Sequence, residues 1–257
     1  MSSITSNKGY HAGKILARRL LSPTVVELEL EVSSEVTFRP GQWIDFVVPP
    51  YDWIGGFSMT SLPRELPKLK FAVKKSRHPP SQWIHSEESK EIGRNVQVQV
   101  GGNCVLRQDN LNVNQPVVFC AGGIGISPLF SMYKYWTEVQ NQRPDNEVKP
   151  SASFLYSVST EDELVFGEEL SDLAANNIEN HNLVLSLTQQ SSWKNSSSCQ
   201  LQNVQYATGR YMKKFLQSAD PSSAFYICGP PAMLDEGVDF LKQRGIDKSN
   251  IHYEKWW

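Results

Sequence analysis

The sequence has few cysteines, and none of them lies close to another. Cys104, Cys120, Cys199 and Cys228 are spread along the chain, and no CxxC pair occurs. Zinc sites and iron–sulfur clusters are usually held by closely spaced thiolates, so we expect no metal site. Two of the four cysteines lie in apolar runs, where a cysteine usually acts as a small buried side chain. This usage predicts a reducing compartment, the cytoplasm or the mitochondrial matrix.

An excess of one charge and long apolar runs are also missing. The 25 Lys and Arg residues nearly balance the 27 Asp and Glu residues, which gives a formal net charge of -2. Proteins that bind nucleic acid usually have a clear basic excess, so we expect no such partner. No apolar run is long enough to span a bilayer, which predicts a soluble protein. No oligomeric state is predicted.

The N-terminus lacks the apolar core of a secretory signal. Only basic charged residues precede the first acidic residue, Glu27, which is compatible with an organelle-targeting segment. The stretch KILARRLLSPTVVELELEV also fits folded strands, and we favour this interpretation. A flexible tail is therefore expected only over residues 1–10.

The first half of the chain is rich in strand patterns. In VVELELEV, residues 25–32, apolar residues alternate with glutamates, which is the period of a strand with one face in water. Further strand patterns, separated by turns, are RPGQWIDFVV, KLKFAVKK and NVQVQV, and a short helical pattern lies near PSQWIHS. Many short strands predict an antiparallel β-barrel domain over residues 11–113.

The second half alternates between strand and helix patterns. The run PVVFCA, residues 116–121, is continuously apolar, as in a strand that is buried on both faces. Further strand patterns are SFLYSV, LVLSLTQ and AFYICG, and the helix patterns lie after Pro128 and in GEELSDLAAN, YMKKFLQSA and PPAMLDEGVDFLKQRG. This alternation predicts an α/β domain with a parallel sheet over residues 114–257.

A glycine-rich turn, CAGGIGISPLF, joins the first of these strands to its helix. Gly123, Gly125 and Pro128 fit a G-x-G-x-x-P spacing, and Ser127 is expected to cap the helix. A turn without side chains lets a phosphate approach the helix N-terminus, although it is also compatible with a plain strand–helix connection. A second turn of this kind, in AFYICGPPAML, favours a binding site at the sheet edge.

Five motifs together resemble the ferredoxin–NADP reductase superfamily of flavin-dependent reductases. In chain order they are FRPGQWIDF, GFSMTS, AGGIGISPLFSM, CGPPAML and IHYEKWW. The combination of FYICGPP with the final EKWW is similar to the animal oxidoreductase NAD-binding domain-containing proteins. The resemblance implies that hydride passes from NADH or NADPH to a flavin in the barrel, and that electrons then pass to an unidentified acceptor, for which a separate protein is one candidate.

The resemblance also implies roles for individual residues around the flavin. The choice between FAD and FMN stays open, with FAD favoured because it is commoner in that superfamily. Phe57 would stack on or beside the ring, and Ser58 would place its hydroxyl next to it. The remaining residues implied on the flavin side are Met59, Thr60 and Ser61 of the same motif, Val73 and Lys74 of the next strand, Ser81 at the phosphates, and Glu254 with Trp256 or Trp257 at the border of the ring.

On the nucleotide side, the resemblance implies phosphate contacts for the first glycine turn and nicotinamide contacts for the second. The implied residues are Gly122, Gly123, Gly125, Ile126 and Pro128 for the phosphates, and Cys228, Gly229 and Pro230 for the nicotinamide. Cys228 would lie close to the transferred hydride. The residues that we expect to act in the reaction are therefore Ser58, Cys228 and Glu254.

One residue of the family's flavin motif is absent. The motif begins with an arginine that pairs with the flavin phosphates, and Gly55 stands at that position. Backbone N–H groups or other cations (Lys74, Lys75, Arg77 or Arg94) are possible substitutes. The alternative is a non-catalytic NAD(P)H-binding module that has lost tight flavin binding.

The sequence favours NADH over NADPH. Glu161 and Asp162 follow the second strand of the α/β half, where an arginine is usual when a 2′-phosphate is bound. Their carboxylates would repel that phosphate and could accept hydrogen bonds from ribose hydroxyls, although they also fit a solvated turn. Arg210 is a candidate for contact with an adenosine phosphate.

Overall fold

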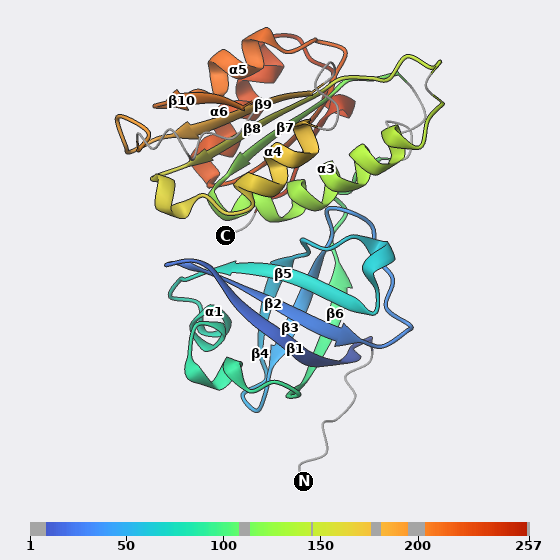
Figure 1. Cartoon of the computed structure of the whole chain (residues 1–257), viewed down its shortest axis with the longest axis vertical. Helices are drawn as coiled ribbons and strands as arrows, with labels where there is room; N and C mark the ends of the chain where they lie inside the picture. The colour runs from blue at the N-terminus through green and yellow to red at the C-terminus, as the bar shows by residue number, and fades with distance from the viewer. Residues whose placement is uncertain (1–8, 108–113, 145, 176–180, 195–203, 256–257) are drawn as a thin grey trace. The chain divides into compact units, whose positions relative to one another are not determined.

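The computed structural model describes residues 9–107, 114–144, 146–175, 181–194 and 204–255. The chain divides into two compact units, Met1–Val105 and Leu106–Trp257 (Figure 1). We call them the N-terminal and C-terminal units. Of the expected tail over residues 1–10, only Gly9 and Tyr10 are described, and the expected boundary at residues 113 and 114 falls at the end of a segment outside the described residues.

The N-terminal unit is an antiparallel sheet of six strands with the order β4-β3-β6-β1-β2-β5. An isolated bridge between Met59, just after β4, and Phe71 of β5 connects the two edges of the sheet, which closes it into a barrel. The elements are β1 (His11–Ser22), β2 (Val25–Val32), β3 (Trp43–Val48), β4 (Trp53–Ser58), β5 (Lys68–Lys74), α1 (Pro79–Ile84) and β6 (Asn95–Gly101).

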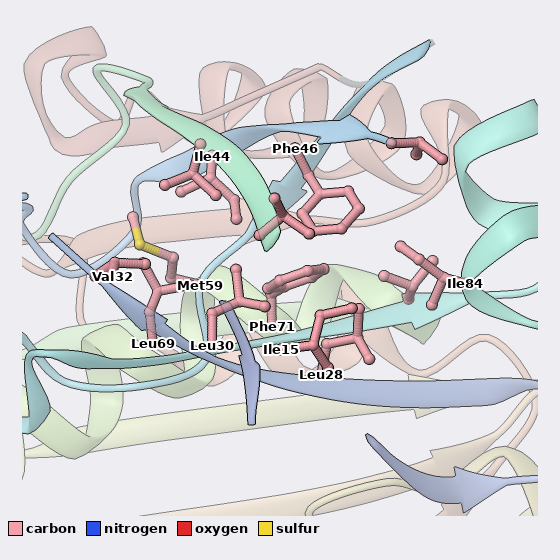
Figure 2. Close-up of a cluster of buried hydrophobic side chains, with 14 of the residues drawn as sticks. Ile15, Leu28, Leu30, Val32, Ile44, Phe46, Met59, Leu69, Phe71 and Ile84 are labelled. Atoms are coloured by element: carbon pink, nitrogen blue, oxygen red, sulfur yellow. The ribbon is translucent and has the colours of Figure 1, made fainter. Parts of the chain in front are cut away.

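Alternate residues of these strands fill the barrel. Figure 2 shows Leu28 and Leu30 of β2 with Phe46 of β3 and Phe71 of β5 in one cluster, and all four side chains are fully buried. The face of β2 that was expected to lie in water is only partly exposed. Glu27 is 7% exposed, and its carboxylate accepts a hydrogen bond from the Arg19 guanidinium at 3.0 Å. A neighbouring strand therefore covers this end of the glutamate face.

The C-terminal unit is a parallel sheet of six strands with the order β10-β9-β8-β7-β11-β12. Its elements are β7 (Val117–Gly122), α3 (Ile126–Asn141), β8 (Ala152–Val158), α4 (Gly167–Ala175), β9 (His181–Leu187), β10 (Val204–Thr208), α5 (Met212–Ser218), β11 (Ala224–Cys228), α6 (Pro231–Gln243) and β12 (Ile251–Tyr253). The sequence patterns did not predict β10, because this edge strand has partly exposed and polar residues instead of an apolar run.

Helices cover both faces of this sheet, with α3 and α4 on one side and α5 and α6 on the other (Figure 1). Phe119 points toward α3, where its ring lies 5.8 Å from that of Tyr133, and Cys120 packs in the cluster that includes α5 and α6. Burial of both faces explains the continuous apolar run of β7. The predicted fold class, a β-barrel followed by an α/β parallel-sheet domain, is confirmed. None of the helices among the described residues is long and apolar enough to cross a membrane.

Candidate functional site

The carboxyl ends of β7 and β11 lie side by side at one edge of the parallel sheet. Going along the chain, β8, β9 and β10 follow on one side of β7, and β11 and β12 then lie on its other side. The strand order therefore reverses between β7 and β11. In open parallel sheets, ligands bind in the crevice outside the strand ends at such a reversal. Both turns that the sequence singled out leave the sheet here.

The two turns touch through their glycines. A Cβ atom on Gly125 would lie 2.4 Å from the carbonyl oxygen of Cys228 and 2.5 Å from its carbonyl carbon. A Cβ atom on Gly122 would lie 2.4 Å from Met233 Sδ and 2.8 Å from Pro230 Cδ. Any side chain at these positions would push the turns apart. The predicted residues of the two turns therefore lie together, and glycine is what permits the contact.

Two further glycines lie at the same sheet edge. A Cβ atom on Gly229 would lie 3.1 Å from both the Cα and the nitrogen of Gly122, so this contact is also close. Gly123 has a left-handed backbone with φ of +52°. Apart from its chain neighbours, no atom of the described residues lies within 4 Å of the place where its Cβ would be. The open side of Gly123 leaves the backbone accessible to a ligand.

The helix after the first turn begins earlier than predicted. A 3₁₀ turn over Gly123–Gly125 leads directly into α3 at Ile126, so Pro128 lies in the first turn of the helix. Ser127 does not cap the helix. Its hydroxyl is buried and has no hydrogen-bond partner among the residues that the structure describes. An unpartnered hydroxyl beside the positive end of a 16-residue helix fits a phosphate oxygen.

The residues expected near the nicotinamide lie at the ends of β11 and β12. Cys228 is the last residue of β11 and is 5% exposed, and Pro230 is exposed and directly precedes α6. Glu254 is half-buried and follows β12, which pairs in parallel with β11. Cys228 and Glu254 therefore end neighbouring strands at the same sheet edge. Trp256 and Trp257 lie outside the described residues.

The acidic turn after β8 is bound by the loop that follows β9. Glu161 Oε2 accepts a hydrogen bond from the backbone N–H of Lys194 at 2.9 Å, and the Lys194 ammonium pairs with Asp162 at 2.5 Å. The hydrogen bond to Asp162 raises the pKa of Lys194. The side-chain oxygen of Gln190 accepts from the Glu161 N–H at 3.1 Å. The sequence did not point to Gln190 or Lys194, because a polar loop carries no periodic signal.

In the N-terminal unit, part of the flavin motif faces the barrel core. Met59 is fully buried, as Figure 2 shows, and Val73 is 2% exposed. Phe57 is partly exposed, and its ring stacks on Phe71 with centroids 5.4 Å apart. Lys74 is half-buried at the end of β5. Of these residues, Phe57 and Lys74 have side-chain surface that a ligand could contact.

Two of the predicted hydroxyls bind backbone instead. Ser61 is fully buried, and its Oγ accepts a hydrogen bond from the Lys70 N–H at 3.0 Å. Ser81 is 2% exposed, and its Oγ donates to the Lys74 carbonyl at 3.0 Å. Each hydroxyl holds a loop against β5. The proposed phosphate contact of Ser81 would require its hydroxyl to leave the Lys74 carbonyl.

Ser58 and Thr60 are the other hydroxyls of the motif. Ser58 is half-buried at the end of β4. Thr60 is 2% exposed, and its Oγ1 has no hydrogen-bond partner among the described residues. Because a buried hydroxyl is normally paired, the unpartnered Thr60 hydroxyl is compatible with contact to a polar ligand atom.

The position of the missing arginine is filled by other side chains. A Cβ atom on Gly55 would lie 2.7 Å from Pro80 Cβ and 2.8 Å from two ring atoms of Phe57. The first atom of an arginine side chain already has no room here. These residues therefore do not fit a flavin that is held by its pyrophosphate in the way that the resemblance implies. The residues of this motif that could still contact the flavin ring are Phe57, Ser58 and Thr60.

Comparison with known proteins identifies the family. Residues 119–238 match the model of the oxidoreductase NAD-binding domain. Over 243 residues the chain is 35% identical to oxidoreductase NAD-binding domain-containing protein 1 of Danio rerio, which covers 92% of this chain and 88% of that protein. The chain belongs to this family. The resemblance drawn from the motifs is confirmed, and the family is described as one of NAD-binding oxidoreductases.

Solved structures confirm the fold of this family member. The cytochrome P450 reductase GcoB of Amycolatopsis superposes with a TM-score of 0.78 at 19% identity, over 96% of this chain and 69% of that chain. The ferredoxin-NADP+ reductase of Plasmodium falciparum superposes with a TM-score of 0.74 at 20% identity, over 98% of each chain. At such low identity the two structures support the fold alone.

Proposed function

We propose that this protein oxidises NADH at the edge of its parallel sheet and passes the hydride to a flavin. Electrons would then pass to an unidentified acceptor, and a separate protein is one candidate. The observation that carries this proposal is the contact of Gly125 with the Cys228 carbonyl. This contact brings both glycine turns to the point where the strand order reverses, which is where dinucleotides bind in sheets of this kind.

The first turn would hold the phosphates of the nucleotide. The N–H groups at the start of α3 and the hydroxyl of Ser127 are donors of the kind that a phosphate accepts, and the helix dipole favours its negative charge. Gly122, Gly123 and Gly125 would keep the backbone open to the phosphate, and Pro128 would stabilise the helix start. The side chain of Ile126 is fully buried, so Ile126 would contact the phosphate through its backbone.

The second turn would hold the nicotinamide ring. Cys228, Gly229 and Pro230 offer small or flat surfaces that allow a ring to lie close to the backbone. Glu254, half-buried after the adjacent strand, would hold a proton or orient the ring. Cys228 would contact the carbon that carries the hydride. These residues orient and desolvate the reacting group, and hydride transfer itself needs no protein nucleophile.

A flavin, when bound, supplies a two-electron acceptor that can also release single electrons. In the N-terminal unit, Ser58 and Thr60 would hydrogen-bond to its ring, and Phe57 would cover part of its face. The resemblance favours FAD over FMN. In the resembling superfamily an arginine contacts the flavin phosphates, and Gly55, which stands at that position, has no side chain to make this contact.

NADH is proposed over NADPH because of the acidic turn after β8. Glu161 and Asp162 add negative charge at the strand end where the adenosine ribose is expected, and the cation beside them, Lys194, is paired with Asp162. A 2′-phosphate would have to compete for that lysine. Ribose hydroxyls could instead donate to the carboxylates.

A non-catalytic NADH-binding module is the second candidate. It is favoured by the packing of Pro80 and Phe57 against Gly55, which leaves no room for the arginine of the flavin motif. In this case the C-terminal unit would bind the nucleotide, and no hydride would leave it.

Anaerobic titration of the full chain separates the two candidates. NADH is added first, and its binding is followed by quenching of tryptophan fluorescence. Flavin is then added, and the loss of NADH absorbance and the bleaching of oxidised flavin are recorded together. Equal amounts of NADH consumed and flavin bleached support the oxidoreductase. NADH binding without bleaching of FAD, FMN or riboflavin would establish the module instead.

A further inference from the structure

The start of α1 offers few donors that could replace the missing arginine at a flavin pyrophosphate. The helix begins with Pro79 and Pro80, neither of which has an N–H to donate. The hydroxyl of Ser81 donates to the Lys74 carbonyl and accepts from the Ser76 N–H, both at 3.0 Å. The two prolines therefore offer no donor, and the Ser81 hydroxyl is already engaged with backbone groups.

Two of the candidate cations, Lys75 and Arg77, offer only weak compensation. Lys75 and Arg77 lie on the loop before α1, and both are exposed. Exposed cations on a loop gain little from a phosphate, because their charges are screened and their long side chains lose freedom on binding. An arginine held in a strand would instead give a bidentate, preorganised contact.

For the ring of a flavin, in contrast, the N-terminal unit has side chains that could make contact. Thr60 carries a buried hydroxyl without a partner among the described residues, and Ser58 is half-buried nearby in the chain. Phe57 keeps part of its ring exposed. Hydroxyls and an aromatic surface recognise the polar edge and the face of the isoalloxazine, which are identical in riboflavin, FMN and FAD.

We infer that the flavin is an exchangeable second substrate, recognised by its ring, and not an FAD retained by its pyrophosphate. This inference rests on the proposed function. In the balanced reaction, the C–H bond at the nicotinamide C4 breaks and its hydride passes to the oxidised flavin. One proton from water completes the dihydroflavin, so that NADH, flavin and a proton give NAD+ and dihydroflavin. The dihydroflavin then dissociates and carries both electrons to the acceptor.

Equilibrium binding of three flavins to the full chain tests the inference. Riboflavin, FMN and FAD are titrated separately, and the quenching of their own fluorescence gives each dissociation constant. We expect the three constants to lie within a factor of ten, and we expect gel filtration to strip the flavin from the protein. Binding of FAD more than tenfold tighter than riboflavin would overturn the inference, because the phosphates would then carry the affinity.

Three variants locate the contact. Thr60→Val keeps the shape of the side chain and removes the hydroxyl, so the affinities for riboflavin and FAD should fall by the same factor, and Thr60→Ser should restore them. The double variant Lys75→Ala, Arg77→Ala should change the FAD affinity by less than threefold. A loss confined to FAD in the double variant, or no loss for either flavin in Thr60→Val, contradicts recognition by the ring.

The outcomes also separate this inference from the proposed function. If FAD alone is bound tightly and is bleached by NADH, the inference fails and the oxidoreductase function stands. If NADH binds but bleaches none of the three flavins, the oxidoreductase function fails.

Discussion

Replacing Gly125 by alanine tests the contact on which the nucleotide site depends. Gly125 has φ of −61° and ψ of −7°, so an alanine adopts this backbone without strain, and the effect is purely steric. Its Cβ would lie 2.4 Å from the Cys228 carbonyl oxygen and 2.7 Å from the Gly229 nitrogen, whereas ordinary contacts begin at 3.4 Å. Because these neighbours are backbone atoms, the two turns must separate by about 1 Å.

A shift of about 1 Å is large for a binding site, because a hydrogen bond of about 2.9 Å is lost when it lengthens by that amount. Each lost bond to the nucleotide costs about 1 kcal/mol, and more for a charged phosphate. Two lost bonds therefore predict at least a tenfold rise in the dissociation constant for NADH, since about 1.4 kcal/mol corresponds to a factor of ten. The overpacking should also lower the free energy of unfolding by about 1–3 kcal/mol.

The assay is an NADH titration of Gly125→Ala together with its thermal denaturation. Gly245→Ala serves as the matched control, because Gly245 follows α6 with φ of +77°. Apart from its chain neighbours, no atom of the described residues lies within 4 Å of where its Cβ would be. This control should lose about 1 kcal/mol of stability through backbone strain while binding NADH normally. A folded Gly125→Ala protein whose NADH affinity stays within twofold of the native value would refute the proposed site.

Two other predictions concern pH and nucleotide preference. Burial lowers the pKa of His181 from 6.5 to about 4, and its Nδ1 lies 2.6 Å from the Tyr133 hydroxyl. Because the unfolded chain binds this proton more readily, up to about 3 kcal/mol of stability should be lost as the pH falls from 6.5 to 4, and denaturant titrations of His181→Gln should show a flatter pH profile. Asp162→Ala should release Lys194 and raise the affinity for NADPH relative to NADH about threefold to fivefold, measured by competition titration. In the control, Lys194→Ala, that ratio should not rise, and a rise there would show that the lysine has no part in the preference.

Patterns confined to a few neighbouring residues were predictable from the sequence. The apolar run of β7 and the glycines that follow it predicted a buried strand, a turn and a helix, and these elements are present. Such features follow from backbone geometry and from local periodicity, which a short window of sequence contains. The exact start of α3 was not predictable, because the 3₁₀ turn over Gly123–Gly125 runs directly into the helix.

Other features could not be predicted because they depend on residues that are distant in the chain. Glu27 fits the exposed side of an alternating strand, yet pairing with β1 leaves it 7% exposed beside Arg19. The edge strand β10 has no clear apolar pattern, and its pairing with β9 defines it. In both cases the neighbouring strand, and not the local sequence, determines the environment of the residue.

The amino-acid sequence by itself determined the order of the two units, the positions of the glycine turns and the absence of an arginine at position 55, since these are properties of neighbouring residues. The tertiary structure alone decided that Gly125 lies against Cys228 and that Pro80 packs beside Gly55. Contacts of this kind are made by close packing between segments that fold together from distant parts of the chain. Local propensities do not encode them, and side-chain volumes decide them only after the strands are paired.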